Sequence, residues 1–126
     1  MGMYTELYLS CEFNEDLPKE AENVLLHLFG DGPVPETLPD HQFFSCDRWG
    51  QIGRMSSFYF TPFPLSKIVK EQGNYYLTTR SDLKNYDSEI IEFLDWVKPY
   101  IDASEDDFIG YYRYEESDNP TLIYGV

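Results

Sequence analysis

The sequence predicts one α+β domain over residues 1–126, a two-layer sandwich with two helices on one face of a mostly antiparallel sheet. Three observations lead to this prediction. A chain of 126 residues suits one compact domain. Its 42% hydrophobic and 17% aromatic residues are enough to build a core. The hydrophobic patterns follow the order strand, helix, several strands, helix and two strands, which is related to the ferredoxin-like arrangement.

The first strand and the first helix have the clearest patterns. Residues 4–13 alternate as a half-buried strand does, with one face made of Leu7, Leu9, Cys11 and Phe13. The opposite face carries Tyr4, Glu6, Tyr8, Ser10 and Glu12. Residues 18–29 have the spacing of an amphipathic helix, with an apolar stripe of Ala21, Val24, Leu25 and Leu28. We expect Asn14 or Asp16 to cap this helix and Gly30 to end it.

The middle of the chain has weaker patterns. Residues 31–41 contain three prolines and are predicted to be a loop. Residues 47–55 fit either one helical turn capped by Asp47, which we favour, or a hairpin closed by residues 50–53. The strands predicted next are residues 56–61, 67–70 and 75–80, the last two joined by a four-residue hairpin loop.

A second helix is predicted from the capping residue Asp87 to about Ile101. Pro99 is expected to weaken its last turn, because proline removes a backbone donor from the helix. The segments after it are an acidic loop and the two strands of a terminal hairpin, at residues 102–107, 108–114 and 121–124.

The chain carries 23 acidic and 9 basic residues, a formal net charge of −14. This charge repels the phosphates of nucleic acids and anionic membranes, so neither is an expected partner. Residues 1–40 hold nine acids and one base, residues 41–80 two acids and five bases, and residues 81–126 twelve acids and three bases. Two acidic thirds therefore flank a mildly basic, aromatic middle.

The sequence also indicates a compartment. Apolar stretches are only a few residues long, and the N-terminus lacks the pattern of a secretory signal. The two cysteines, Cys11 and Cys46, are too few for a disulfide framework, and each lies among aromatic residues. We expect both to be buried, reduced thiols of a cytoplasmic protein.

Residues that catalysis or metal binding would need are sparse. His27 lies beside the apolar stripe of the first helix, which predicts a packing role. His41 with Cys46 and Asp47 does not have the spacing of a zinc site. The acidic run from Asp102 lacks the glycine and glutamate that a calcium-binding loop needs at its sixth and twelfth positions. We therefore predict no catalytic residues, no metal and no cofactor.

Tyrosine is the most distinctive feature, with 11 copies. Tyr4 and Tyr8 share a strand face with two glutamates, and Tyr112 and Tyr114 lie on the last hairpin. If both helices cover one side of the sheet, the other side displays tyrosines among carboxylates. Tyrosine is enriched in protein interfaces because it offers a large contact area with a polar tip. A solvated tyrosine surface fits the pattern equally well.

Two blocks of sequence carry a resemblance: FFSCDRW followed by SSFYF, and YYLTTRSDLKNYDSEIIEFLDWVKPYI, with PTLIY closing the chain. Together they resemble small acidic proteins of unknown function from bacteria and their phages or prophages, over residues 43–124. The resemblance implies a bacterial or phage origin and a non-housekeeping role. It implies no catalytic residues.

We expect the protein to act by binding a basic site on a larger protein, as a nucleic-acid mimic or as an immunity protein that neutralises a toxin. The expected contact surface consists of Asp102, Glu105, Asp106, Asp107, Tyr112, Tyr114, Glu115, Glu116 and Asp118. The alternative is a module that binds an anionic nucleotide through Arg48, Trp49, Arg54, Tyr59 and Arg80. We also expect a monomer or a weak dimer paired through residues 121–124.

Overall fold

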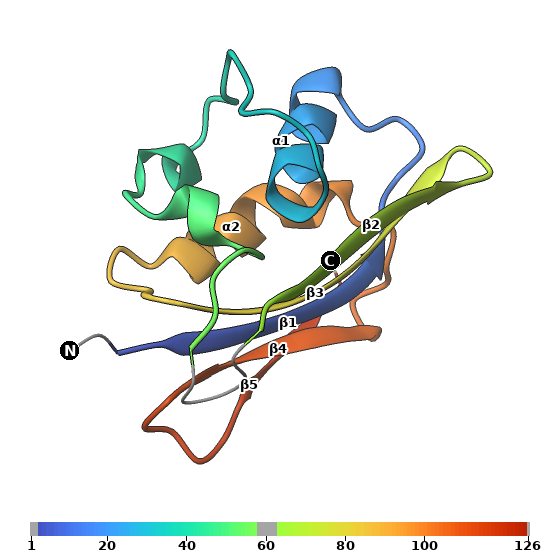
Figure 1. Cartoon of the computed structure of the whole chain (residues 1–126). Helices are drawn as coiled ribbons and strands as arrows, with labels where there is room; N and C mark the ends of the chain where they lie inside the picture. Colours follow the sequence, from blue (N-terminus) through green and yellow to red (C-terminus); the bar gives the residue numbers. More distant parts are fainter. Residues whose placement is uncertain (1–2, 58–62, 126) are drawn as a thin grey trace.

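The computed structural model describes residues 3–57 and 63–125. Its elements, with η for short 3-10 helices, are β1 (Thr5–Glu12), α1 (Lys19–Phe29), η1 (Gln42–Ser45), η2 (Trp49–Gln51), β2 (Leu65–Glu71), β3 (Asn74–Leu83), α2 (Glu89–Val97), η3 (Lys98–Tyr100), β4 (Phe108–Tyr114) and β5 (Thr121–Tyr124). Figure 1 shows α1 and α2 on the same side of one sheet. The predicted α+β sandwich is confirmed.

The sheet has the strand order β2-β3-β1-β4-β5, and all neighbouring pairs are antiparallel. β3 lies between β1 and β2, and β1 lies between β3 and β4. The unit β1–α1–β2 therefore has β3 between its two strands, and the unit β3–α2–β4 has β1 between its two strands. This is the ferredoxin-like order expected from the sequence, with β5 added as an edge strand.

The core lies between the sheet and the helices. The alternation of β1 is as predicted for Leu7, Leu9 and Phe13, which have no exposed surface. Leu7 pairs with Ser81 of β3 and Tyr112 of β4, so the register places these residues on the same, helix-facing side of the sheet. The same register determines which residues of β1, β3 and β4 face the helices.

The predicted cap of α1 is wrong. Pro18 occupies the N-cap position and has no side chain that can accept a hydrogen bond. The amide of Asn14 instead donates to the carbonyl of Pro99 at 3.1 Å, which ties the entry of α1 to the end of the second helical segment. Gly30 ends the helix as predicted, and its N–H donates to the carbonyl of Leu26 at 3.0 Å.

The predicted cap of α2 is displaced by two residues. Ser88, in the left-handed region at φ 61°, precedes the helix, and its side chain makes no capping bond. Asn85 rather than Asp87 supplies the acceptor, because its Oδ1 accepts the backbone N–H of Ile90 at 2.8 Å. At the other end the α-helix stops at Val97, where the Pro99 segment continues as the 3-10 helix η3.

The middle segment forms short helices. Residues 47–55 contain the helical turn η2 and not the alternative hairpin, but its N-cap is Arg48, so the predicted cap at Asp47 is wrong. The sequence did not predict η1, which places Phe43 against the ring of Trp96 at a centroid distance of 6.1 Å. The strand predicted at residues 56–61 lies mostly outside the described residues.

Both predicted hairpins are present. The loop between β2 and β3 is shorter than predicted, because the strands extend to Glu71 and Asn74. Gln72 and Gly73 form it with positive φ angles of 51° and 89°, the pattern of a type I′ turn. The β4–β5 hairpin has a register shift between Phe108 and Gly110.

The cysteines are free thiols. Cys46 is buried, whereas Cys11 is only half-buried and so is less enclosed than predicted. Burial raises the pKa of the Cys11 thiol to about 12. Burial also raises the pKa of Cys46, and the nearby charge of Glu89 adds to that effect.

Candidate partner-binding site

A cavity of about 370 Å³ lies at the end of the sheet where β4 turns into β5. Three tyrosines and several polar side chains line it. We name it the tyrosine pocket, and its lining residues are Met3, Thr5, Asn85, Tyr86, Tyr112, Arg113, Tyr114, Ser117, Asn119 and Thr121. An aromatic lining with a few converging polar groups is typical of a small binding site.

The strand register places two of the tyrosines in this pocket. Tyr112 pairs with Leu7 and Tyr114 pairs with Thr5, and both β1 residues are buried on the helix-facing side. Tyr112 is partly buried against the core, while Tyr114 and Tyr86 are exposed. The pocket therefore has a packed aromatic floor and an open aromatic mouth. Tyr86 was not predicted, because it lies between β3 and α2, where no periodic pattern indicates its position.

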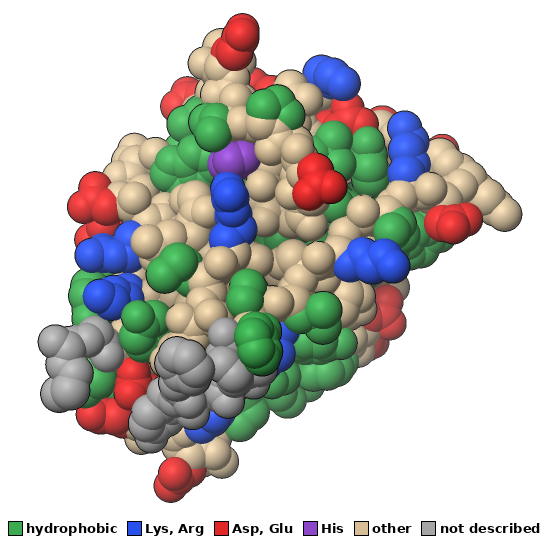
Figure 2. All heavy atoms as spheres, viewed as in Figure 1, with side chains coloured by type: hydrophobic (Ala, Val, Ile, Leu, Met, Phe, Trp, Pro, Cys, Tyr) green, Lys and Arg blue, Asp and Glu red, His purple; other side chains and the backbone are tan. Residues whose placement is uncertain are grey.

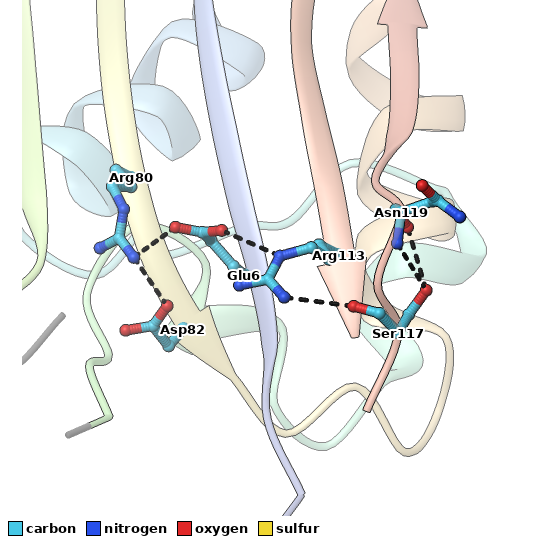
Figure 3. A network of polar contacts seen from close by, with 6 residues as sticks. All are labelled: Glu6, Arg80, Asp82, Arg113, Ser117 and Asn119. Carbon is cyan, nitrogen blue, oxygen red and sulfur yellow. Dashed lines mark hydrogen bonds and ion pairs between the residues drawn. The ribbon is translucent and has the colours of Figure 1, made fainter. Parts of the chain in front are cut away.

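Carboxylates of the β4–β5 turn give the mouth of the pocket a negative potential. The pKa of Tyr114 is raised, first by partial desolvation and then by the charges of Glu116 and Glu115. The cationic lining residue, Arg113, is already neutralised. Its Nε lies 3.9 Å from Oε1 of Glu6, and its guanidinium donates to the carbonyl of Ser117 at 3.2 Å (Figure 3).

The acidic residues predicted to form one contact surface lie at two ends of β4. The first group precedes the strand and is exposed: Asp102, Glu105, Asp106 and Asp107. The second follows it and consists of Glu115, Glu116 and Asp118, of which Glu115 is half-buried. At the rise of a β-strand, the two groups are roughly 25 Å apart. Only the second group lies beside the tyrosine pocket.

One face of the sheet is not covered by the helices, and the tyrosines on this uncovered face differ from those predicted. Tyr112 and Tyr114 pair with Leu7 and Thr5, which face the helices, so the predicted place of both tyrosines on the uncovered face is wrong. The neighbouring Tyr111 takes that place, and its ring stacks on Tyr8 at a centroid distance of 5.6 Å. The pair covers the middle of the sheet with aromatic surface.

Glu6 lies beside this stack and is buried, although its position in the alternation predicted solvent exposure. Its side chain is 8% exposed, because Arg80 of β3 and Arg113 of β4 flank it (Figure 3). The guanidinium of Arg80 contacts the Glu6 carboxylate and also lies 3.4 Å from Oδ1 of Asp82, which has no exposed side-chain surface. A compact charge network therefore stabilises this face of the sheet.

The residues expected to bind an anionic ligand are Arg48, Trp49, Arg54, Tyr59 and Arg80, and the ring of Trp49 lies 6.0 Å from that of His27. Arg48 lies 5.0 Å over the ring of Tyr86, and Arg54 lies 3.2 Å from Nε2 of His27. Arg80 belongs to the network on the other side of the sheet. Tyr59 lies outside the described residues. Figure 2 likewise shows Lys and Arg side chains scattered among Asp and Glu on the face in view.

His41 shares a cluster of possible metal ligands with Glu92 and Asp95. Its Nδ1 accepts the backbone N–H of Phe43 at 2.9 Å. The proton of a neutral ring is then on Nε2, which donates to Oδ2 of Asp95 at 2.8 Å. A metal ion would need the lone pair of one of these nitrogens, so binding it would break the bond that caps η1. The geometry therefore suits a structural histidine.

His27 has the packing role predicted for it. It is buried in α1. Arginine is always a donor, so Nε2 of His27 accepts from Arg54, and Nδ1 donates to the carbonyl of Gly32 at 3.3 Å. These bonds hold the loop after α1 against the helix.

Comparisons with protein-family models, with curated proteins and with solved structures find no match for this chain. Among the residues that the structure describes, no helix has the length and apolar character needed to cross a bilayer.

Proposed function

We propose that this protein acts without catalysis, by binding a basic site on a larger protein through the tyrosine pocket and the acidic turn beside it. The exposed carboxylates of Glu116 and Asp118, in the turn beside the pocket that Tyr114 lines, carry this proposal, while the carboxylate of Glu115 accepts the backbone N–H of Tyr4. A Lys or Arg side chain of the partner enters between aromatic faces, which attract cations. The carboxylates outside the pocket supply opposite charge and speed the encounter.

Such binding makes the protein an inhibitor or a neutralising partner. A basic site that binds this surface is no longer free to bind nucleic acid or another acidic ligand. This fits the expectation of a nucleic-acid mimic or an immunity protein of a bacterial or phage system. The proposed setting is the cytoplasm, where both thiols stay reduced.

A matched pair of charge variants tests the proposal. Glu116→Gln with Asp118→Asn removes two charges beside the pocket, and Glu15→Gln with Asp16→Asn removes two exposed charges before α1. Each variant is used as bait in a bacterial lysate at low and at physiological salt, and captured proteins are titrated against the purified baits. We expect a basic protein whose affinity falls at least tenfold with the first variant and less than twofold with the second.

A third bait, Tyr86→Ala, separates the pocket from general electrostatics. Tyr86 is exposed, so its removal leaves the core intact. The affinity is expected to fall at least fivefold, with the salt dependence unchanged, because this substitution removes an aromatic surface and no charge. If both charge variants lose the same amount of affinity and Tyr86→Ala has no effect, the partner responds only to net charge, and the proposed surface is wrong.

A further inference from the structure

The two edges of the sheet differ in how they are protected. β2 carries Lys67 and Lys70, and such charges discourage another strand from pairing with an edge. β5 has the sequence Thr-Leu-Ile-Tyr, without a charge or a proline. Its protection is limited to its short length.

The hydrogen-bond parity of the hairpin shows which backbone groups of β5 are free. The N–H of Glu115 donates to the carbonyl of Tyr4, so residues 115, 113 and 111 direct their backbone groups toward β1. Tyr112 and Gly110 then direct theirs toward β5, where they pair with Thr121 and Ile123.

The residues between these partners face the free edge. The N–H and C=O groups of Leu122 and Tyr124 therefore point away from β4. Gly125 directs its backbone groups toward β4, as Ile123 does, and its N–H donates to the carbonyl of Asp107 at 3.0 Å. Within the described part of the chain, β5 is the last strand on this side of the sheet.

A groove accompanies this edge. A cavity of about 270 Å³ lies between α2 and the hairpin, lined by Ile91, Leu94, Asp95, Lys98, Tyr112, Thr121, Leu122 and Ile123. It shares Tyr112 and Thr121 with the tyrosine pocket, so the two cavities form one continuous surface. Ile91 of α2 is exposed in this groove, whereas the exposed side chain of Leu122 lies on the other face of β5, because Leu122 pairs with Tyr111. The alternating side chains of a strand added to β5 would contact Ile91 on one face and Leu122 on the other.

The charges at the two ends of β5 determine what can be added. Loop 102–107 lies at the end near Tyr124, and turn 115–118 lies at the end near Thr121. In an antiparallel pair of two copies, the acidic turn of each would meet the acidic loop of the other, and both contacts would be repulsive. A basic segment meets opposite charge at both ends.

We propose that β5 binds an extended segment of the partner as a sixth strand, apolar in its middle and rich in Lys or Arg at both ends. This inference rests on the proposed function, because it specifies the form in which the basic partner binds. Backbone hydrogen bonds to Leu122 and Tyr124 hold the segment, and its alternate side chains fill the groove against Ile91. A segment of about eight residues spans the distance between the two acidic groups.

The test uses the synthetic peptide Lys-Lys-Thr-Val-Thr-Val-Lys-Lys and amide hydrogen exchange of the full protein followed by NMR. The amides of Leu122 and Tyr124 are expected to exchange at least tenfold more slowly with the peptide present. The amides of Thr121 and Ile123 already bond within the hairpin, so their exchange should change less. A peptide that is N-methylated at alternate residues cannot form the ladder and should give no protection. Equal protection by both peptides, or none by either, would overturn the proposal.

Two substitutions at one position connect this test with the natural partner. Leu122→Pro removes an N–H that faces the free edge and leaves the bonds to β4 intact, whereas Leu122→Ala shortens the side chain and keeps the N–H. We expect Leu122→Pro to weaken partner binding at least tenfold and Leu122→Ala by less than threefold, with circular dichroism confirming that both are folded. If Glu116→Gln weakens binding but Leu122→Pro does not, the sixth strand is refuted and the proposed function stands. If neither weakens it, both are wrong.

Discussion

Replacing Arg80 with Met tests how far the buried carboxylates of the uncovered sheet face depend on one guanidinium. The side chain of Arg80 is 17% exposed, and it contacts Glu6 and Asp82, whose side chains are 8% and 0% exposed. Methionine keeps most of the aliphatic volume and removes the charge. The substitution therefore takes a counter-ion from two buried carboxylates without opening a large cavity.

The burial and contacts of Arg80 determine how much free energy of unfolding the substitution is expected to cost. Removing one partner of a buried ion pair costs about 3–5 kcal/mol, because the other charge stays buried and uncompensated. Arg80 is partly solvated, and Arg113 remains 3.9 Å from the Glu6 carboxylate, so we expect the lower end of that range. A loss of about 3 kcal/mol is a large part of the stability of a small domain. It corresponds to a fall in Tm of roughly 10 °C.

Urea unfolding followed by tryptophan fluorescence measures this loss, since Trp96 is buried between α2 and η1. The matched control is Arg48→Met, which removes only the cation–π contact with Tyr86 and should cost about 0.5–1 kcal/mol. Equal losses for the two variants would refute the reasoning. That result would mean that solvent or Arg113 compensates Glu6 and Asp82 without Arg80.

Three further predictions concern stability and reactivity. The hydroxyl of Tyr75 donates to Oε2 of Glu22 at 2.5 Å, and this bond, with burial, raises the pKa of Tyr75 to about 12. Because this pKa is higher in the folded state, the bond makes its full contribution to the free energy of unfolding at pH values below the ordinary tyrosine pKa near 10. The contribution is lost as the pH rises from 10 to about 12. Tyr75→Phe should therefore reduce the alkaline loss of stability in urea titrations, and an unchanged pH profile would contradict the bond. Because burial raises the pKa of Cys11 and Cys46, a thiolate-specific reagent should label both thiols only as urea unfolds the protein, and rapid labelling of the native state at neutral pH would be evidence against this burial. Gly73→Ala should cost about 1 kcal/mol because of the positive φ in the turn, while Gly50→Ala, where an added methyl meets no neighbour, should cost almost nothing. The difference between their urea midpoints checks this.

Local patterns predicted the parts of the fold that depend on neighbours in sequence. The alternation around Leu7 and the helical stripe that contains Leu25 each have one apolar face, so burial can be read from spacing. β4 is different, because FIGYYRY has apolar residues at both parities. Its face is decided by the pairing of Tyr112 with Leu7, which is a contact across the fold and is not visible in the local sequence.

The candidate site was predictable only in part for the same reason. The acidic turn and Tyr114 were identified from composition, whereas Tyr86 joins them only because the chain returns there before α2. The burial of Glu6 requires arginines from two other strands, and no spacing within β1 indicates them. The capping errors have a local origin, since more than one candidate cap precedes each helix; α2 uses Asn85, and α1 uses none of its candidates.

The central position of β1 affects how the protein forms during synthesis. The ribosome releases β1 first, but one of its two neighbours, β4, begins at Phe108. In a nascent chain that has emerged only to α2, β3 is available to pair with β1 and β4 is not. The sheet can be completed only after β4 and β5 have been synthesised, and contacts of such long sequence separation slow folding. Until that moment the half-built sheet offers β1, instead of β5, as its open edge.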